Sequence, residues 1–252
     1  MSVVGIIPAR YNSTRFPGKP LALIKGKTMI RRVCEQAWRA NLDAVVVATD
    51  DVRIADEVMG FGGRYVLTDP NHRSGTDRCR EALDLLENQY DAVVNIQGDE
   101  PFIDPNQINQ VVELISREGI GLASLAKRIG DAEELFSSNT VKVVMDRQGN
   151  ALYFSRSPIP FMRNLDRDEW LAKGVFHKHI GIYAYKAETL RQIADMQPTA
   201  LELSESLEQL RWLENGLEIR MGVTRCDNVS IDMPSDMEKA ERFAQNLSND
   251  SI

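Results

Sequence analysis

Three cationic side chains fall within ten residues near the start of this 252-residue chain. Arg10, Arg15 and Lys19 share the segment 8–20 with two hydroxyl residues and Gly18. Guanidinium forks and a lysine ammonium suit phosphate oxygens, and a glycine lets the backbone approach them closely. The segment therefore predicts a phosphate-binding loop, with a solvated basic loop as the alternative. It is not a Walker A loop, because the GxxxxGK[ST] pattern is missing.

Two aspartates lie where strands are expected to end. Asp99 follows the apolar run 92–96, and Asp232 comes shortly before Pro234. Mg²⁺ is commonly held by one or two carboxylates together with substrate phosphates, so Asp99 is a candidate metal ligand. For Asp232 the local pattern favours a helix N-cap, because Asp often precedes a helix that begins with proline.

Histidines in the second half of the chain are candidates for binding a substrate. His177 and His179 are two residues apart on an expected strand and so face the same side. A metal pair is possible, but no third ligand is evident, so a hydrogen bond to a substrate is favoured. A polar segment at 72–78 opens an expected helix, and its backbone could bind an anion or a base edge.

Acidic and amide side chains cluster near the start of a helix expected over 203–215. The spacing of Glu205, Glu208 and Gln209 lets Glu205 share a helix face with either of the others. A solvated acidic first turn is the alternative interpretation.

Short apolar runs that alternate with helical patterns must position these side chains. Such alternation predicts an α/β fold with a mostly parallel sheet and helices on both faces. Ligands of such sheets lie at the carboxyl ends of the strands. Without repeats or low-complexity linkers, residues 1–252 are expected to form a single domain. Strands are expected at 3–7, 44–48, 65–67, 92–96, 179–185 and 219–223, a hairpin at 141–154, and helices at 29–40, 53–61, 76–86, 105–115, 187–196, 203–215 and from 234.

Composition excludes several classes of protein. A net charge of −7 argues against general nucleic-acid binding, which needs a basic surface. No apolar run approaches the ~20 residues of a membrane span, so membrane insertion is not expected. The N-terminal residues do not read as a signal peptide, which makes the cytoplasm the expected location. Cys34, Cys79 and Cys226 lack the spacing of a disulfide framework or a zinc site and are expected to be free thiols.

Several blocks of the chain, in one order, resemble the 3-deoxy-manno-octulosonate cytidylyltransferase family. This family couples CTP to 3-deoxy-manno-octulosonate (Kdo), an acidic eight-carbon sugar, to make CMP-Kdo for lipopolysaccharide. The resemblance spans residues 7 to about 241 and implies a nucleotide-binding core, a smaller sugar-binding and dimer-forming sub-domain mainly within 140–190, and a homodimer. The blocks are IPARYNSTRFPGKPL (7–21), SGTDR (74–78), NIQGDEP (95–101), LYFSR (152–156), KHIGIY (178–183) and SLEQLR (206–211).

The resemblance also implies roles for individual residues. Arg10, Arg15 and Lys19 would bind the triphosphate, and Arg10 and Lys19 would stabilise charge at the α-phosphorus. Asp99 and Asp232 would be Mg²⁺ ligands, which replaces the cap interpretation of Asp232. A hydroxyl acidified by Mg²⁺ would attack in line, since no side chain is an obvious general base. The cytidine site would comprise Pro8, Ala9, Arg73, Ser74 and Gly75, the Kdo site Arg156 (for the sugar carboxylate), His179, Tyr183, Glu208 and Gln209, and Gln97 would lie between the two substrates.

Departures from the family pattern leave two alternatives. Met233 stands where the family usually has threonine, Ser235 where it has glutamate, and Asn12 where a small residue is usual. One alternative is a cytidylyltransferase for another acidic sugar, such as a sialic acid or an amino-substituted Kdo. The other is a non-catalytic nucleotide-binding regulator, against which the retention of Arg10, Lys19, Asp99 and Asp232 argues.

Overall fold

The computed structural model describes residues 1–226 and 230–249, and it divides into two compact units. The first unit comprises Met1–Asn109 and the segment that starts at Asp227, and the second comprises Gln110–Cys226. The sub-domain expected within 140–190 falls inside the second unit. No helix among the described residues combines the length and the apolar composition needed to cross a membrane.

Four parallel strands form the sheet of the first unit. Their order is β6-β1-β4-β5, and every neighbouring pair is parallel. All four strands carry β-branched or apolar side chains, and most of these residues are buried, as expected for strands covered on both faces. The strands are β1 (Val3–Ala9), β4 (Ala44–Thr49), β5 (Tyr65–Leu67) and β6 (Ala92–Asn95).

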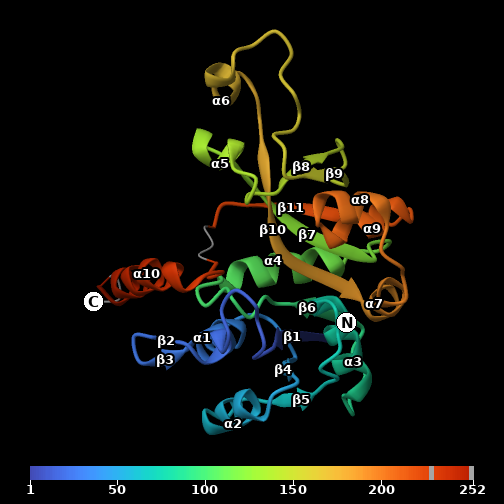
Figure 1. The fold of residues 1–252 in the computed structure, drawn as a ribbon. Coiled ribbons are helices and arrows are strands. Elements are labelled where there is room, and N and C mark those ends of the chain that lie inside the picture. The colour runs from blue at the N-terminus through green and yellow to red at the C-terminus, as the bar shows by residue number, and fades with distance from the viewer. Residues whose placement is uncertain (227–229, 250–252) are drawn as a thin grey trace. The chain divides into compact units, whose positions relative to one another are not determined.

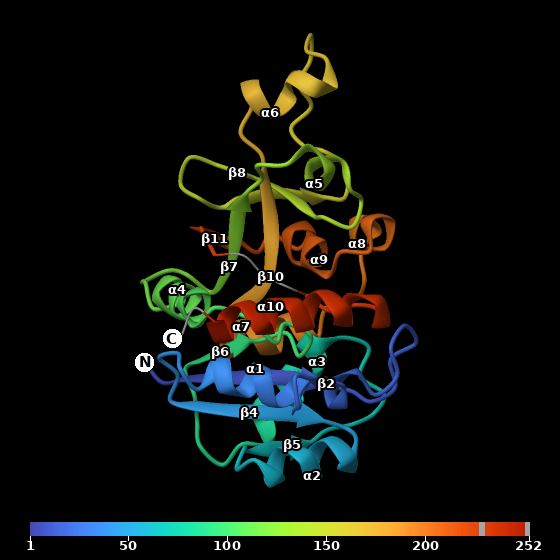
Figure 2. The same cartoon turned by 90° about the vertical axis from the view of Figure 1, so that its left-hand side faces the viewer.

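Helices cover both faces of this sheet. Helix α1 lies against one face and α3 against the other (Figures 1 and 2). Helices α1, α2 and α3 each begin at a side chain that accepts from a free backbone N–H group. Thr28 caps α1, Asp51 caps α2, and Ser74 forms a capping box in α3. The elements are η1 (Lys19–Leu21), β2 (Leu23–Ile24), β3 (Lys27–Thr28), α1 (Met29–Ala37), α2 (Val52–Gly60), α3 (Gly75–Leu85), η3 (Pro234–Asp236) and α10 (Met237–Asn249); α4 (Pro105–Ile115) spans the sequence boundary between the units.

The strands of the second unit are mainly antiparallel. Its strands run in the order β11-β7-β10-β8-β9, and β11–β7 is the parallel pair. The strands are β7 (Leu122–Arg128), β8 (Lys142–Met145), β9 (Ala151–Ser155), β10 (His177–Lys186) and β11 (Arg220–Thr224). The helices are α5 (Ala132–Phe136), η2 (Arg167–Glu169), α6 (Trp170–Lys173), α7 (Ala187–Ala194), α8 (Ala200–Glu205) and α9 (Glu208–Glu214).

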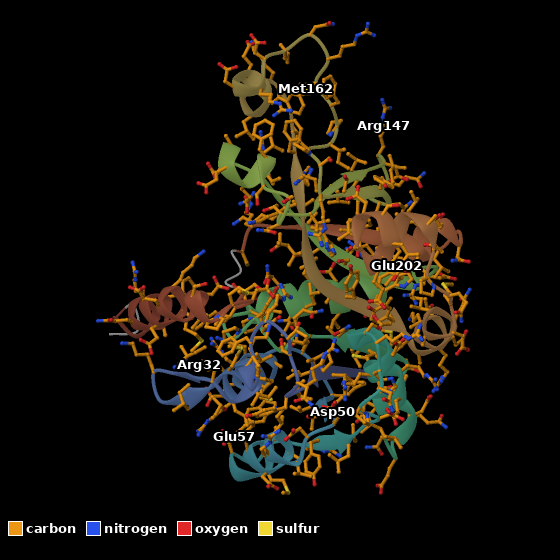
Figure 3. The ribbon with its side chains drawn as sticks, in the orientation of Figure 1. Arg32, Asp50, Glu57, Arg147, Met162 and Glu202 are labelled. Carbon is orange, nitrogen blue, oxygen red and sulfur yellow. The ribbon has the colours of Figure 1, made fainter. Side chains whose placement is uncertain are left out.

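The single helix expected over 203–215 is wrong, because two helices occupy this stretch. Ser206 takes a left-handed backbone conformation (φ 52°) that ends α8, and α9 begins two residues later. Arg211 of α9 donates hydrogen bonds of 2.7 and 2.6 Å to both carboxylate oxygens of Glu202 on α8, and Glu202 is labelled in Figure 3. This partly buried ion pair holds the two short helices together.

Candidate active site

A cavity of about 340 Å³ opens in the first unit, beside the carboxyl ends of β1 and β6. Most residues predicted to bind the nucleotide line it, whereas Arg73 is exposed outside it and Asp232 is not among its lining residues. The predicted residues in the lining are Pro8, Ala9, Arg10, Arg15, Lys19, Ser74, Gly75, Gln97 and Asp99, and the further ones are Asn12, Ser13, Thr14, Pro20, Arg78 and Gly98.

Lys19 and Asp99 meet at this cavity although 80 residues separate them in sequence. The Lys19 ammonium donates to Asp99 Oδ2 at 2.7 Å and to the Ile231 carbonyl at 3.0 Å, and it lies 4.0 Å from Asp232 Oδ1. Arg15 Nη2 reaches the same Asp232 oxygen at 3.1 Å. Two cations from the first loop therefore converge with the two predicted metal ligands.

The loop that carries these cations is held at Tyr11. The Tyr11 carbonyl accepts hydrogen bonds from the N–H groups of Ser13 (3.0 Å) and Gly18 (2.9 Å). The guanidinium of Arg53 stacks 3.3 Å from the centre of the Tyr11 ring and donates to both oxygens of Asp51, the cap of α2. These hydrogen bonds lower the pKa of Asp51. Sequence reasoning missed this contact, because nothing in the sequence pairs a tyrosine in a loop with an arginine on a helix.

Two features favour glycine at position 18. Its φ of +71° is left-handed, and a Cβ at this position would lie 3.2 Å from the Tyr11 ring. Lys19 follows directly as the first residue of η1, so the turn at Gly18 positions the ammonium.

The turn that bears Asp232 is supported by a different carboxylate. Asp236 Oδ2 accepts from the N–H groups of Asp232 (2.9 Å) and Met233 (2.8 Å). The cap interpretation of Asp232 is therefore wrong, since Met233 is the N-cap of η3 and the Asp232 carboxylate pairs with Arg15. The Ile231 N–H donates to the Asp99 carbonyl at 3.0 Å, which fixes this turn beside Asp99.

Close contacts of two glycines with Pro8 also shape the cavity. A Cβ on Gly98 would lie 2.9 Å from the Pro8 carbonyl oxygen, and one on Gly75 would lie 3.3 Å from Pro8 Cγ. Ser74 and Asp77 form the capping box that directs the start of α3 toward this point.

Arg78 is a lining residue to which sequence reasoning gave no role. Its side chain is 3% exposed and donates to Asp50 Oδ2 at 3.3 Å and to Thr68 Oγ1. Asp50, labelled in Figure 3, directly follows β4. The signal that could have found Arg78 is its place in the SGTDR block, where it follows the predicted Ser74 and Gly75.

Two residues predicted to bind sugar lie together in the second unit. His179 Nε2 and Ser124 Oγ are 2.9 Å apart, and the His179 ring contacts Tyr183 at 5.3 Å between centroids. Burial lowers the pKa of His179 to about 3, so the imidazole is neutral at physiological pH. Burial, together with the charge of Glu208, raises the pKa of Tyr183, which stays a neutral hydroxyl. These two side chains can exchange hydrogen bonds with a polyhydroxylated ligand without adding charge.

Arg156 lies at the end of β9 and is bound to the turn between α8 and α9. Its Nε donates to the Glu205 carbonyl at 2.7 Å, Nη1 to the Ser138 carbonyl at 3.0 Å, and Nη2 to the Ser206 carbonyl at 3.3 Å. A guanidinium has five N–H groups, so two remain for a ligand. The shared face expected for Glu205, Glu208 and Gln209 is wrong, since Glu205 ends α8 while the other two open α9.

Comparison with known proteins establishes the class first: residues 4–219 match the cytidylyltransferase family. A relative from Parabacteroides distasonis, named 3-deoxy-manno-octulosonate cytidylyltransferase, is 51% identical over 250 residues, covering 98% of this chain and 99% of the relative. A relative of the same name from Cytophaga hutchinsonii is 52% identical over 239 residues, covering 94% and 95%. This chain belongs to the 3-deoxy-manno-octulosonate cytidylyltransferase family.

A solved structure agrees with this assignment. It is a CMP:2-keto-3-deoxy-manno-octonic acid synthetase complexed with CTP. It superposes with a TM-score of 0.90 at 38% sequence identity and covers 98% of this chain and 99% of its own. The expected α/β fold is thereby confirmed.

Proposed function

We propose that this protein transfers CMP from CTP to the anomeric hydroxyl of Kdo, releasing pyrophosphate and forming CMP-Kdo. One observation carries the proposal: Arg15, Lys19 and Asp99 line one cavity, and Asp232 lies beside them, 3.1 Å from Arg15 and 4.0 Å from Lys19. The family assignment supports CTP as the donor and Kdo as the acceptor. The product would serve lipopolysaccharide biosynthesis.

In this reaction the sugar oxygen forms a bond to the α-phosphorus while the bond to the β-phosphate oxygen breaks. Arg10, Arg15 and Lys19 would bind the triphosphate and offset the charge that develops on its oxygens. Pro8, Ala9, Ser74 and Gly75, together with Gln97, would hold the cytidine and its junction with the sugar. Arg73 remains part of this proposal as the neighbour of Ser74, although it is exposed and is not among the residues that line the cavity.

Asp99 and Asp232 fit a magnesium site by their chemistry. Both offer carboxylate oxygens within 4.0 Å of the same ammonium nitrogen, and Mg²⁺ takes one or two carboxylates plus phosphate oxygens and water. When bound, the ion would neutralise phosphate charge and lower the pKa of the attacking hydroxyl. Lys19 and Arg15 would then exchange carboxylate contacts for phosphate contacts.

The acidic sugar would be held by residues of the second unit. Arg156 would receive the sugar carboxylate, and His179, Tyr183, Glu208 and Gln209 would bind hydroxyl groups. The low pKa of His179 argues against a general base that carries the proton away as an imidazolium. No other side chain takes that role in the proposal.

The direct test is pyrophosphate release by the purified protein with CTP, Kdo and Mg²⁺. We expect release that requires all three components, with ATP, GTP and UTP as controls for the base. Faster turnover with a sialic acid or an amino-substituted Kdo would replace Kdo as the substrate. Saturable CTP binding without pyrophosphate release from any of these sugars would favour the nucleotide-binding regulator.

A homodimer and a cytoplasmic location belong to the same proposal. Exposed apolar side chains of the second unit support a partner surface: Leu152, Phe161 and Val175 are 61%, 75% and 56% exposed. A sedimentation measurement at micromolar concentration checks the dimer, and a monomeric mass would contradict it. The cytoplasm is where a nucleoside triphosphate would be supplied.

A further inference from the structure

Lys142 is a fully buried lysine that no part of the proposed mechanism uses. Its exposure is 0%, and its ammonium donates to the carbonyls of Ser137 (2.8 Å), Thr140 (2.6 Å) and Arg156. These three acceptors satisfy all three N–H bonds, yet none of them carries a charge. Burying an ammonium without a bound carboxylate is unfavourable, so this position needs an explanation.

The acceptors of Lys142 are the backbone around Arg156. Lys142 pairs with Ser155 across the β8–β9 hairpin, and its ammonium then binds the carbonyl of Arg156 itself. Both cations also hold the loop 137–140: Lys142 through Ser137 and Thr140, and Arg156 through Ser138. The ammonium thus fixes the main chain from which the guanidinium projects and the loop on which it rests.

One carboxylate faces these two cations. Glu205 accepts from Ser155 Oγ at 2.6 Å and from the Arg156 N–H at 2.9 Å. Its charge favours the protonated form of Lys142, whereas burial and the charge of Arg156 lower the Lys142 pKa. Two cations against one carboxylate leave a net positive charge in a partly dehydrated region. A ligand carboxylate would compensate that charge.

We infer that Lys142 is a positioning residue for the acidic sugar, holding Arg156 in place and supplying the positive charge that the sugar carboxylate balances. The inference rests on the proposed function, in which Arg156 binds the sugar carboxylate, and it identifies Lys142 as the residue that supports Arg156. It separates two contributions, the tether on the Arg156 backbone and the charge of the ammonium.

Two substitutions distinguish these contributions. Lys142→Gln keeps a side chain that can donate two hydrogen bonds to the loop but removes the charge, whereas Lys142→Met removes both. We expect Lys142→Gln to raise the KM for Kdo about tenfold, since hydrogen bonds and pairing to charged groups are worth about this much. The KM for CTP and the kcat at saturating Kdo are expected to stay within about twofold of wild type. Lys142→Met should have a larger effect on the Kdo KM.

A matched control comes from a neighbouring lysine on β10. Lys178 lies opposite Lys142 in the sheet but is paired with the Glu134 carboxylate. Lys178→Met should leave the Kdo KM within about twofold of wild type, because the charge of Lys178 is already balanced by Glu134 and is not available to the sugar carboxylate. Combining Lys142→Gln with Arg156→Ala should multiply the Kdo KM by less than the product of the single effects, because Lys142 acts through Arg156.

The outcomes separate the inference from the proposed function. If wild-type protein releases no pyrophosphate with Kdo, the proposed function fails and the inference falls with it. If wild type is active and Lys142→Gln lowers thermal stability without changing the Kdo KM, the lysine is only structural and the inference alone is overturned. A Kdo analogue whose carboxylate is reduced to an alcohol gives a test that needs no variant. Equal KM values for the analogue and for Kdo in wild type would also overturn the inference.

Discussion

Single charged groups at the cavity must serve both the folded protein and its ligands. Lys19 is 14% exposed and Asp99 is 27% exposed, so their 2.7 Å contact is partly shielded from water and screened less than a surface pair. The same ammonium binds the Ile231 carbonyl, so the turn beside Asp232 depends on it. Removing the Asp99 charge therefore separates chemistry from folding more cleanly than removing Lys19.

Asp99→Asn should abolish turnover while leaving the fold intact. Asparagine keeps the shape and can still accept a hydrogen bond from Lys19, but it removes the charge that would hold Mg²⁺. We expect kcat to fall at least about a hundredfold, typical for the loss of a group that stabilises charge in a transition state. Pyrophosphate release measures turnover, and circular dichroism measures folding.

A second aspartate supplies the control for that variant. Asp84 pairs with Arg80 on the exposed surface of α3. Asp84→Asn should therefore keep wild-type turnover. Unchanged activity in Asp99→Asn would remove Asp99 from the metal site.

His179 should make stability depend on pH. Its pKa is about 3 in the folded protein and about 6.5 when unfolded, so the unfolded chain takes up a proton first as the pH falls. The stability linked to His179 is therefore complete above pH 6.5 and is lost progressively toward pH 3. Between these pH values the free energy of unfolding should fall by about 1.4 kcal/mol for each pH unit.

Denaturant unfolding of wild type and His179→Gln between pH 5 and 7 measures this effect. The variant should show the flatter dependence on pH, because it lacks the titrating group. Parallel curves for the two proteins would show that His179 is not the source.

At the scale of elements, α2 stabilises the predicted phosphate-binding loop (8–20). Arg53 lies at the start of α2, binds the cap residue Asp51, and stacks on Tyr11. A guanidinium over an aromatic ring contributes about 0.5–1 kcal/mol at an exposed site. The helix start thus holds a loop that would otherwise have few fixed side chains.

Arg53→Ala should raise the KM for CTP about threefold to fivefold with a smaller change in kcat, because it loosens Tyr11 and the loop behind Lys19. Steady-state kinetics with CTP varied at saturating Kdo measures the effect. Arg80→Ala removes a comparable exposed arginine from α3 and should leave the CTP KM unchanged. A Kdo KM that rises while the CTP KM does not would contradict the role given to Arg53.

Elements with a strong local pattern could be predicted from the sequence. The strand at 65–67 has its predicted bounds, and β8 and β9 form the hairpin predicted at 141–154, which ends one residue later at Ser155. Strand β7 (Leu122–Arg128) was not predicted, because its run of small and apolar residues has no alternation and is identified by pairing with β10 and β11. The end of α8 at Ser206 could not be predicted, since serine seldom adopts a left-handed conformation.

The residues of the candidate site were likewise predictable only where a local pattern marks them. Arg10, Lys19 and Asp99 could be predicted because strand ends of a parallel sheet meet at one edge. Lys142 could not, because a lysine in a hairpin is normally exposed and only the tertiary structure buries it. The support of Asp232 by Asp236 likewise depends on a turn that the sequence does not specify.

At the scale of the whole molecule, the cavity proposed to bind the nucleotide is lined only by residues of the first unit, and the residues predicted to bind sugar, apart from Gln97, lie in the second. Two cysteines are buried in the first unit: Cys34 in α1 and Cys79 in α3. Burial raises the pKa of Cys34 to about 12, which keeps the thiol protonated and unreactive. Cys226, in the second unit, is partly exposed.

Native protein should therefore expose one reactive thiol. A chromogenic disulfide reagent should label Cys226 quickly, and Cys34 and Cys79 only after the first unit opens. Labelling of all three at equal rates in native buffer would contradict the burial of α1 and α3. The slow phase then reports opening of the first unit, and CTP should slow it further because ligand binding stabilises the folded state.

The near-contact between Gly98 and Pro8 has a consequence for inhibitors. Where these residues line the cavity, its wall is main chain, with no room for a methyl group between the two strand ends. A resistance mutation alters side chains, and any side chain at position 98 would place a Cβ 2.9 Å from the Pro8 carbonyl oxygen and push β1 and β6 apart. A compound that recognises this stretch of backbone would bind a surface that a substitution of Gly98 can change only by distorting the sheet.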